Sequence, residues 1–118
     1  MNPVVLNIER SRVIGEYNFL YRSRHPDYLV QDIVSIVLST GYRIEVSWWP
    51  EHDPTGRYYL AVLDEHDGSE VEPPLELSSV DEVLQVLHLQ VQRFSAHVIT
   101  FSFATDIGSM QLPNCVVA

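Results

Sequence analysis

Hydrophobic residues recur with helical spacing in two segments of the chain. In the first, the apolar residues between positions 29 and 38 cover an arc of about 200° on a 3.6-residue helical wheel. Pro26 and Asp27 are typical of a helix start, and Thr40 and Gly41 of a helix end. The pattern predicts a helix over 29–38, and the wide arc predicts that this helix contacts two neighbours.

The second segment with helical spacing begins at a capping box. Ser79 and Glu82 are placed so that hydroxyl and carboxylate can each accept a hydrogen bond from a free backbone amide. Leu89 lies on the other side of this helix and indicates a partner surface. The buried stripe of the helix is expected to consist of Val80, Val83, Leu84, Leu87, Val91 and Phe94.

Aromatic and β-branched residues with period-two alternation predict strands before and after each helix. The predicted strands are Tyr17 to Tyr21, Tyr42 to Trp49, Tyr58 to Asp64 and His97 to Phe103, with Met1 to Glu9 as a further edge strand. This order of elements is that of a split β-α-β, or ferredoxin-like, arrangement. We therefore expect a single α+β domain over residues 1–118, with a mainly antiparallel sheet and two helices on one face.

The alternation also predicts which side chains face the helices. The inward set is Ile44, Val46 and Trp48, together with Ile99, Phe101 and Phe103. The outward set is Glu45, Ser47 and Trp49, together with Thr100 and Ser102. The face without helices then carries an exposed tryptophan and one tyrosine of the pair Tyr58 and Tyr59. Because a loop, a subunit or a ligand commonly covers such an aromatic side chain, this face is a candidate binding surface.

The composition limits the chemistry of the chain. Of its 118 residues 46% are apolar, which suffices for one globular core without disulfides or metals. Lysine is absent, which excludes a lysine Schiff base and a P-loop. The single cysteine, Cys115, favours a reducing, cytoplasmic compartment. The first residues do not resemble a signal peptide, and the apolar runs are too short to span a membrane.

The chain is strongly acidic, and the acidity is uneven. Its formal net charge is −9, and from residue 44 onward two arginines face twelve carboxylates. Such a surface repels phosphate backbones, so nucleic acid is not expected as a partner. A basic protein, in contrast, would be attracted to it.

One tripeptide of glutamate, histidine and aspartate occurs twice and has two interpretations. These residue types can bind a metal ion or form a general base with its orienting acid. Each copy also stands beside turn residues, which favours an aspartate that closes a local turn. In a hairpin the copies lie roughly 20 Å apart, so they cannot share a metal ion, and we expect neither metal nor cofactor. The two copies are Glu51-His52-Asp53 and Glu65-His66-Asp67.

Two classes of function remain open. The chain has no serine nucleophile elbow, glycine-rich phosphate loop or zinc-binding histidine pair. This favours a non-catalytic protein-binding module of the inhibitor, immunity or adaptor type. The alternative is a small enzyme or small-molecule-binding protein with a site on the open sheet face or at a dimer interface. In that case Trp49 and a neighbouring tyrosine would form the walls, and His52 or His66 the acid-base group.

Three features leave apolar surface in need of cover: the wide arc over 29–38, Leu89 and Trp49. Because symmetric dimers are the commonest cover, we expect a homodimer. The candidate binding residues are Trp49, Glu51, His52, Asp53, Tyr58, Glu65, His66 and Asp67.

Overall fold

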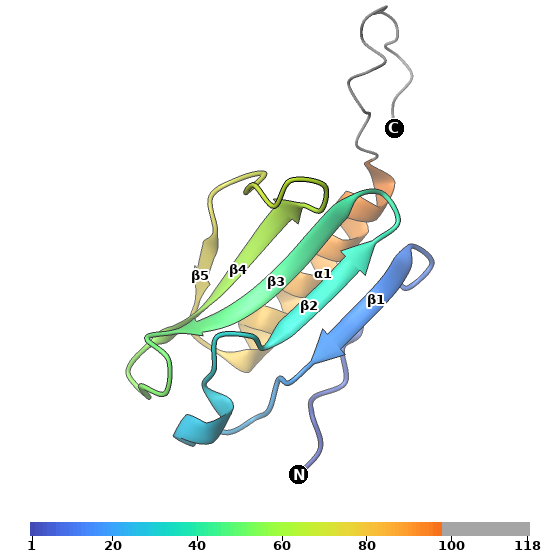
Figure 1. Cartoon of the computed structure of the whole chain (residues 1–118). Coiled ribbons are helices and arrows are strands. Elements are labelled where there is room, and N and C mark those ends of the chain that lie inside the picture. The colour runs from blue at the N-terminus through green and yellow to red at the C-terminus, as the bar shows by residue number, and fades with distance from the viewer. Residues whose placement is uncertain (98–118) are drawn as a thin grey trace, which may run out of the picture.

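The computed structural model describes residues 1–97. It has a five-stranded antiparallel sheet followed by one α-helix (Figure 1). The strands follow the order of the chain, so that each strand pairs with the next. The elements are β1 (Val13–Asn18), a 3-10 turn η1 (Pro26–Tyr28), β2 (Val34–Leu38), β3 (Tyr42–Trp49), β4 (Arg57–Asp64), β5 (Leu75–Leu77) and α1 (Val80–Ala96).

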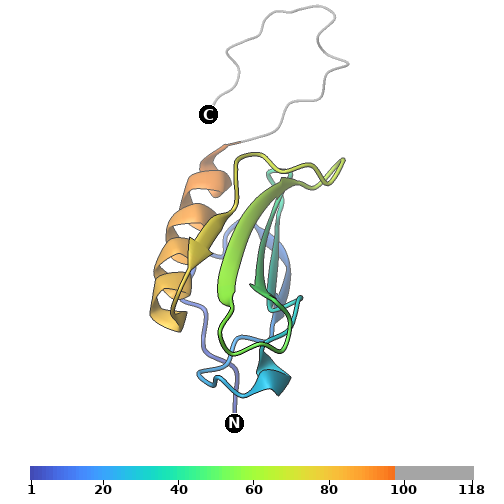
Figure 2. The same ribbon diagram turned by 90° about the vertical axis from the view of Figure 1, so that its left-hand side faces the viewer.

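The α1 helix covers one face of the sheet and leaves the other open (Figure 2). Buried apolar side chains of the helix meet alternate residues of the central strands and form one hydrophobic core. No helix in residues 1–97 is long and apolar enough to cross a lipid bilayer. The core includes Val83, Leu87, Val91 and Phe94 from α1 and Ile36, Ile44, Trp48, Leu60 and Val62 from the sheet.

The N-terminal segment packs beside α1, so the predicted edge strand over Met1–Glu9 is wrong. Leu6 is buried in the core, and Nδ1 of His88 in α1 lies 3.1 Å from the carbonyl oxygen of Asn7. Val4 and Ile8 are partly buried against the same core, and a position at the sheet edge would not offer this cover.

The segment predicted as the first helix, 29–38, is an extended chain that ends in β2, so this prediction is wrong. Buried and half-buried side chains alternate along β2, with Val34, Ile36 and Leu38 in the core. This period of two spreads over many directions when it is projected on a helical wheel, which explains the wide arc. The α+β class and the antiparallel sheet are confirmed. The ferredoxin-like arrangement is not confirmed, since residues 1–97 contain one α-helix and not two.

The hairpin of β3 and β4 agrees with the prediction. β3 has the predicted bounds, and β4 begins one residue earlier than predicted, at Arg57. The predicted faces of β3 are confirmed as well, because Ile44, Val46 and Trp48 are buried and Trp49 is exposed.

The other predicted strands fare differently. β1 ends at Asn18, whereas the sequence predicts a strand from Tyr17 to Tyr21. The chain leaves the sheet here because the side-chain oxygen of Asn18 accepts a hydrogen bond from the Leu20 amide at 2.9 Å. The predicted strand His97 to Phe103 lies, from residue 98 onward, outside the described residues, together with its predicted inward and outward side chains.

Hydroxyl groups fix both ends of α1. Oγ of Ser79 accepts a hydrogen bond from the Glu82 amide at 3.1 Å, as predicted. The Glu82 carboxylate, however, accepts from the amide and hydroxyl of Ser78 at 2.7 and 2.8 Å, one residue before the predicted position. At the other end the buried Oγ1 of Thr40 donates to the Phe94 carbonyl at 2.8 Å and ties the turn between β2 and β3 to the helix.

Candidate docking site on the open sheet face

The open face of the sheet is formed by alternate residues of the strands. The register places Tyr17, Ser35, Glu45 and Ala61 in one row across β1 to β4. Adjacent strands lie ~4.8 Å apart, so the large side chains of Tyr17 and Glu45 start roughly 10 Å apart, with the small Ser35 between them. A gap therefore opens in the middle of this face.

Two adjoining hollows together form what we call the trough. The larger hollow has a volume of about 440 Å³ and the smaller one of about 280 Å³. Gln31 and Ser47 line both hollows, so the two lie side by side. The other lining residues include Tyr17, Asp32, Ser35, Arg43 and Glu45 in the larger hollow, and Trp49 and Tyr59 in the smaller one.

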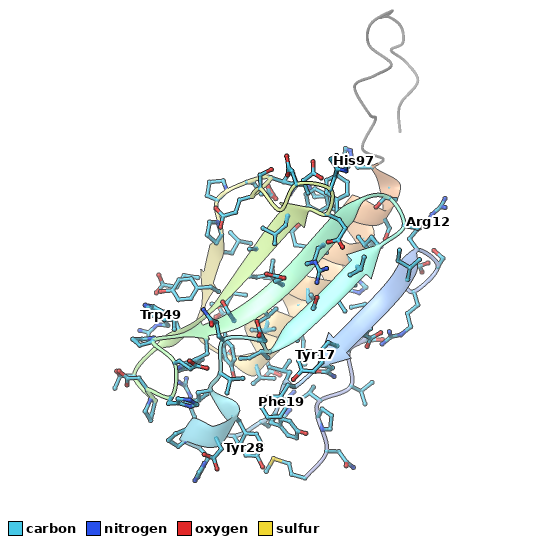
Figure 3. All side chains as sticks on the ribbon, in the orientation of Figure 1. Arg12, Tyr17, Phe19, Tyr28, Trp49 and His97 are labelled. Carbon is cyan, nitrogen blue, oxygen red and sulfur yellow. The ribbon has the colours of Figure 1, made fainter. Side chains whose placement is uncertain are left out.

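Aromatic side chains stand at both ends of the trough. Tyr17 is 51% exposed at one end, and Trp49 is 58% exposed at the other, beside Tyr59. Figure 3 shows Phe19 and Tyr28 next to Tyr17, where they extend the aromatic surface beyond β1. Exposed aromatic side chains of this kind are enriched at protein interfaces.

An arginine forms part of the wall of the larger hollow, and its charge is already neutralised. Nε and Nη2 of Arg43 donate to the two carboxylate oxygens of Glu65 at 2.7 and 2.9 Å. Its Nη1 donates to Oγ of Ser35 at 2.9 Å and lies 3.9 Å from the Glu45 carboxylate. The hydrogen bond to Glu65 raises the pKa of Arg43, and the same bond lowers the pKa of the Glu65 carboxyl.

Carboxylates without such a partner give the trough a negative charge. In the part of the chain that the structure describes, the carboxylate of Asp32 has no hydrogen-bond or ion-pair partner. Glu45 has only the 3.9 Å approach of Arg43, whose bidentate partner is Glu65. Glu51, beside the trough, accepts a hydrogen bond from the Gln31 amide at 3.3 Å.

The first Glu-His-Asp copy lies in the loop between β3 and β4. Oδ1 of Asp53 accepts hydrogen bonds from the amide and hydroxyl of Thr55 at 2.9 and 2.7 Å, and these bonds lower the pKa of Asp53. His52 has a φ of 66°, and its amide donates to the Leu29 carbonyl at 2.7 Å. Its Nδ1 lies 2.9 Å from the carbonyl oxygen of Pro26. This copy holds the loop against η1.

The second copy lies at the opposite end of the same hairpin, in the loop after β4 (Figure 1). Oδ1 of Asp67 accepts from the amide and hydroxyl of Ser69 at 2.9 and 2.7 Å, which lowers the pKa of Asp67. The His66 amide donates to Oδ1 of Asp64 at 2.8 Å. Both copies therefore take part in local turns. Glu51 of the first copy and Glu65 of the second are hydrogen-bonded to residues that line the trough, Gln31 and Arg43.

Of the two neighbouring tyrosines, Tyr59 lines the trough and Tyr58 does not. Tyr58 is buried on the covered face with its ring edge-on to Trp48 at 4.7 Å, and burial raises the pKa of its hydroxyl. Sequence reasoning did not single out Tyr17, Asp32 or Arg43 for the open face. The position of Tyr17 beside Ser35 depends on the register of β1 against β2, which no local pattern in the sequence reveals.

Within residues 1–97 no three histidine, cysteine, aspartate or glutamate side chains converge in a way that could hold a metal ion. Comparison of the chain with protein-family models, with curated proteins and with solved structures gives no match.

Proposed function

We propose that this chain is a non-catalytic protein-binding module, of the inhibitor, immunity or adaptor type, that docks a basic protein on its open sheet face. The observation that carries the proposal is the trough. It combines exposed aromatic rings at its two ends, Tyr17 and Trp49, with two carboxylates. Asp32 has no ion-pair partner within residues 1–97, and Glu45 lies 3.9 Å from Arg43, which is bound to Glu65. Aromatic anchors around a small polar hollow are typical of interface hot spots.

The charge of the chain favours a basic partner. Its net charge is −9, and most of its arginines are already bound to carboxylates. The carboxylates left over can attract a cationic protein and raise the rate of association. The pairs are Arg10–Glu16, Arg22–Asp81, Arg43–Glu65, Arg57–Glu76 and Arg93–Glu72.

The use of titratable groups supports binding over catalysis. Nδ1 of His25 accepts from the Asp27 amide at 3.2 Å, and the rings of His52 and His88 lie 2.9 and 3.1 Å from backbone carbonyls. The pKa of Asp53 is lowered by its own turn and not by a neighbouring catalytic group. These side chains hold loops and the N-terminal segment in place.

The proposal is tested by capture followed by reconstitution. The immobilised chain is exposed to a lysate of the cells that make it, at low and at raised salt, and each captured protein is purified and titrated by calorimetry. We expect a basic protein whose affinity falls with salt and falls at least about tenfold in Tyr17→Ala and Trp49→Ala.

The matched control is Leu89→Ala, because Leu89 is 53% exposed on α1, on the other side of the molecule. This variant should bind like the wild type. Equal binding by all three variants would place the interface elsewhere and overturn the proposal. A stoichiometric metabolite in native mass spectrometry, displaced by Trp49→Ala, would favour the small-molecule alternative instead.

The homodimer stays a prediction. Residues 29–38 no longer support it, because most of their apolar side chains lie in the core. Trp49 lines the hollow on the open face, whereas Leu89 is exposed on α1, which covers the other face, so one symmetric interface can cover only one of them. Light scattering on the wild type, Trp49→Ala and Leu89→Ala shows whether a dimer forms and which side it uses.

A further inference from the structure

We infer that the larger hollow of the trough takes an arginine side chain of the partner, with its guanidinium between the Tyr17 ring and the carboxylates of Asp32 and Glu45. The inference rests on the proposed function and names the group that the site recognises. Asp32 lines the same hollow and offers a second carboxylate.

The size of the gap fits a planar guanidinium. Tyr17 and Glu45 flank Ser35 in the same cross-strand row, roughly 10 Å apart at the backbone. A side chain that enters this gap therefore meets the Tyr17 ring on one side and the Glu45 carboxylate on the other. It lies beside the Arg43 guanidinium, which is bound to Ser35 and whose charge Glu65 neutralises. The hollow of about 440 Å³ leaves room for the aliphatic stem of the arginine as well.

The hydrogen bonds in the wall favour a cation over an anion. An incoming carboxylate or phosphate would have to displace Glu65, which already binds two nitrogens of Arg43. The third nitrogen of Arg43 donates to Ser35. The other charged residues that line the hollow, Asp32 and Glu45, are both negative, and Glu45 lies 3.9 Å from Arg43.

The geometry favours arginine over lysine. A guanidinium can lie flat on the Tyr17 ring and donate in its plane to a carboxylate at the same time, whereas an ammonium is a compact, strongly hydrated charge. Two carboxylates on one hollow suit the several in-plane donors of a guanidinium. The smaller hollow, with Trp49 and Tyr59, is left for an apolar neighbour of that arginine.

The test uses an acetylated pentapeptide amide with one central arginine between serines and glycines. It is titrated into the isotopically labelled full chain and followed by nuclear magnetic resonance. We expect the largest shifts at the amides of Tyr17, Ser35 and Ser47, and weaker binding of the peptides that carry lysine or uncharged citrulline in place of arginine. Asp32→Asn and Glu45→Gln should each raise the dissociation constant about two- to fivefold.

The matched control is Glu70→Gln, which removes the same charge from the exposed loop after β4, outside the trough. Glu70→Gln should bind the peptide like the wild type. An equal loss in all three variants, or shifts centred on other loops, would mean unspecific attraction by the acidic surface and would overturn the inference. The proposed function is tested separately. It stands if binding of the captured partner is weakened by Tyr17→Ala and Trp49→Ala, and it is wrong if neither variant weakens that binding.

Discussion

The two faces of the same sheet follow different rules. On the covered face Ile44, Val46 and Trp48 are at most 1% exposed and pack against α1. On the open face their sequence neighbours are Glu45, Ser47 and Trp49, and these line or border the trough. The side chains of the covered face are restricted by folding, because they must pack closely in the core. The side chains of the open face do not have to pack in the core, so its aromatic and charged residues are available to bind a partner.

The largest expected effect separates two adjacent tryptophans. Trp48 is fully buried, and its Nε1 donates to the Asp53 carbonyl at 2.7 Å. We expect Trp48→Ala to lower the free energy of unfolding by about 3–5 kcal/mol, because it leaves a cavity and removes one of the two hydrogen bonds to the Asp53 carbonyl. Trp49→Ala should cost less than about 1 kcal/mol, since its side chain is 58% exposed.

Urea unfolding followed by circular dichroism measures both variants without relying on tryptophan fluorescence. A large loss in Trp49→Ala that grows with protein concentration would show that a second copy buries Trp49. The open face would then be an interface of the homodimer, and the contrast between the two faces would disappear.

The contrast between the faces also explains what the sequence could predict. The alternation along 42–49 predicted both bounds and both faces of β3, because a strand with one covered face follows the period of two closely. The segment 29–38 has the same period only from Val34 onward. Its first residues are apolar for another reason, since Leu29 and Ile33 fill the core from an irregular connection. The sum of the two patterns resembled a helix.

The binding site was less predictable than the fold. Alternation alone predicted that Trp49 faces the open side, and this is confirmed. The trough also needs Tyr17, Asp32 and Ser35, which come from other parts of the chain and meet only through the register of β1, β2 and β3. The repeated Glu-His-Asp tripeptide is more conspicuous, but the side-chain hydrogen bonds of its two aspartates serve local turns.

The second prediction compares two glycines beside these faces. A Cβ at Gly56 would lie 2.4 Å from the carbonyl oxygen of Trp49 and 2.8 Å from Nε1 of Trp48. Gly56→Ala must therefore push the loop away from Trp48, and we expect a loss of about 1–3 kcal/mol. At Gly15 in β1 the nearest atom would be Cβ of Val37 at 3.5 Å, an ordinary contact. Gly15→Ala should change stability by less than about 1 kcal/mol.

Thermal and urea unfolding of the two alanine variants provide the measurement. Equal stability of Gly56→Ala and Gly15→Ala would mean that the loop after β3 can shift to make room for the added methyl group without a loss in the free energy of unfolding. The packing around Trp48 would then contribute less to the stability of the protein than the burial of its side chain indicates.

The smallest expected effect concerns the ion pair on the open face. Arg43 lowers the pKa of Glu65 from its ordinary value of 4.5, so the folded state binds the proton of this carboxyl less readily than the unfolded chain does. The pair therefore contributes its full stabilisation above about pH 4.5 and loses it as the pH falls through the lower pKa of the folded state. Because the Glu65 side chain is 37% exposed, screening keeps this contribution below about 1 kcal/mol.

We expect Glu65→Gln to be slightly less stable than the wild type at pH 7, with a difference that shrinks as the pH falls below about 4.5. Urea midpoints across this range measure the difference, and Glu70→Gln serves as a control without an ion pair. A difference that persists in acid would mean that the Glu65 side chain acts through packing and not through its charge. The variant also frees Arg43 to meet the partner, so it should weaken binding of the arginine peptide while it leaves the covered face intact.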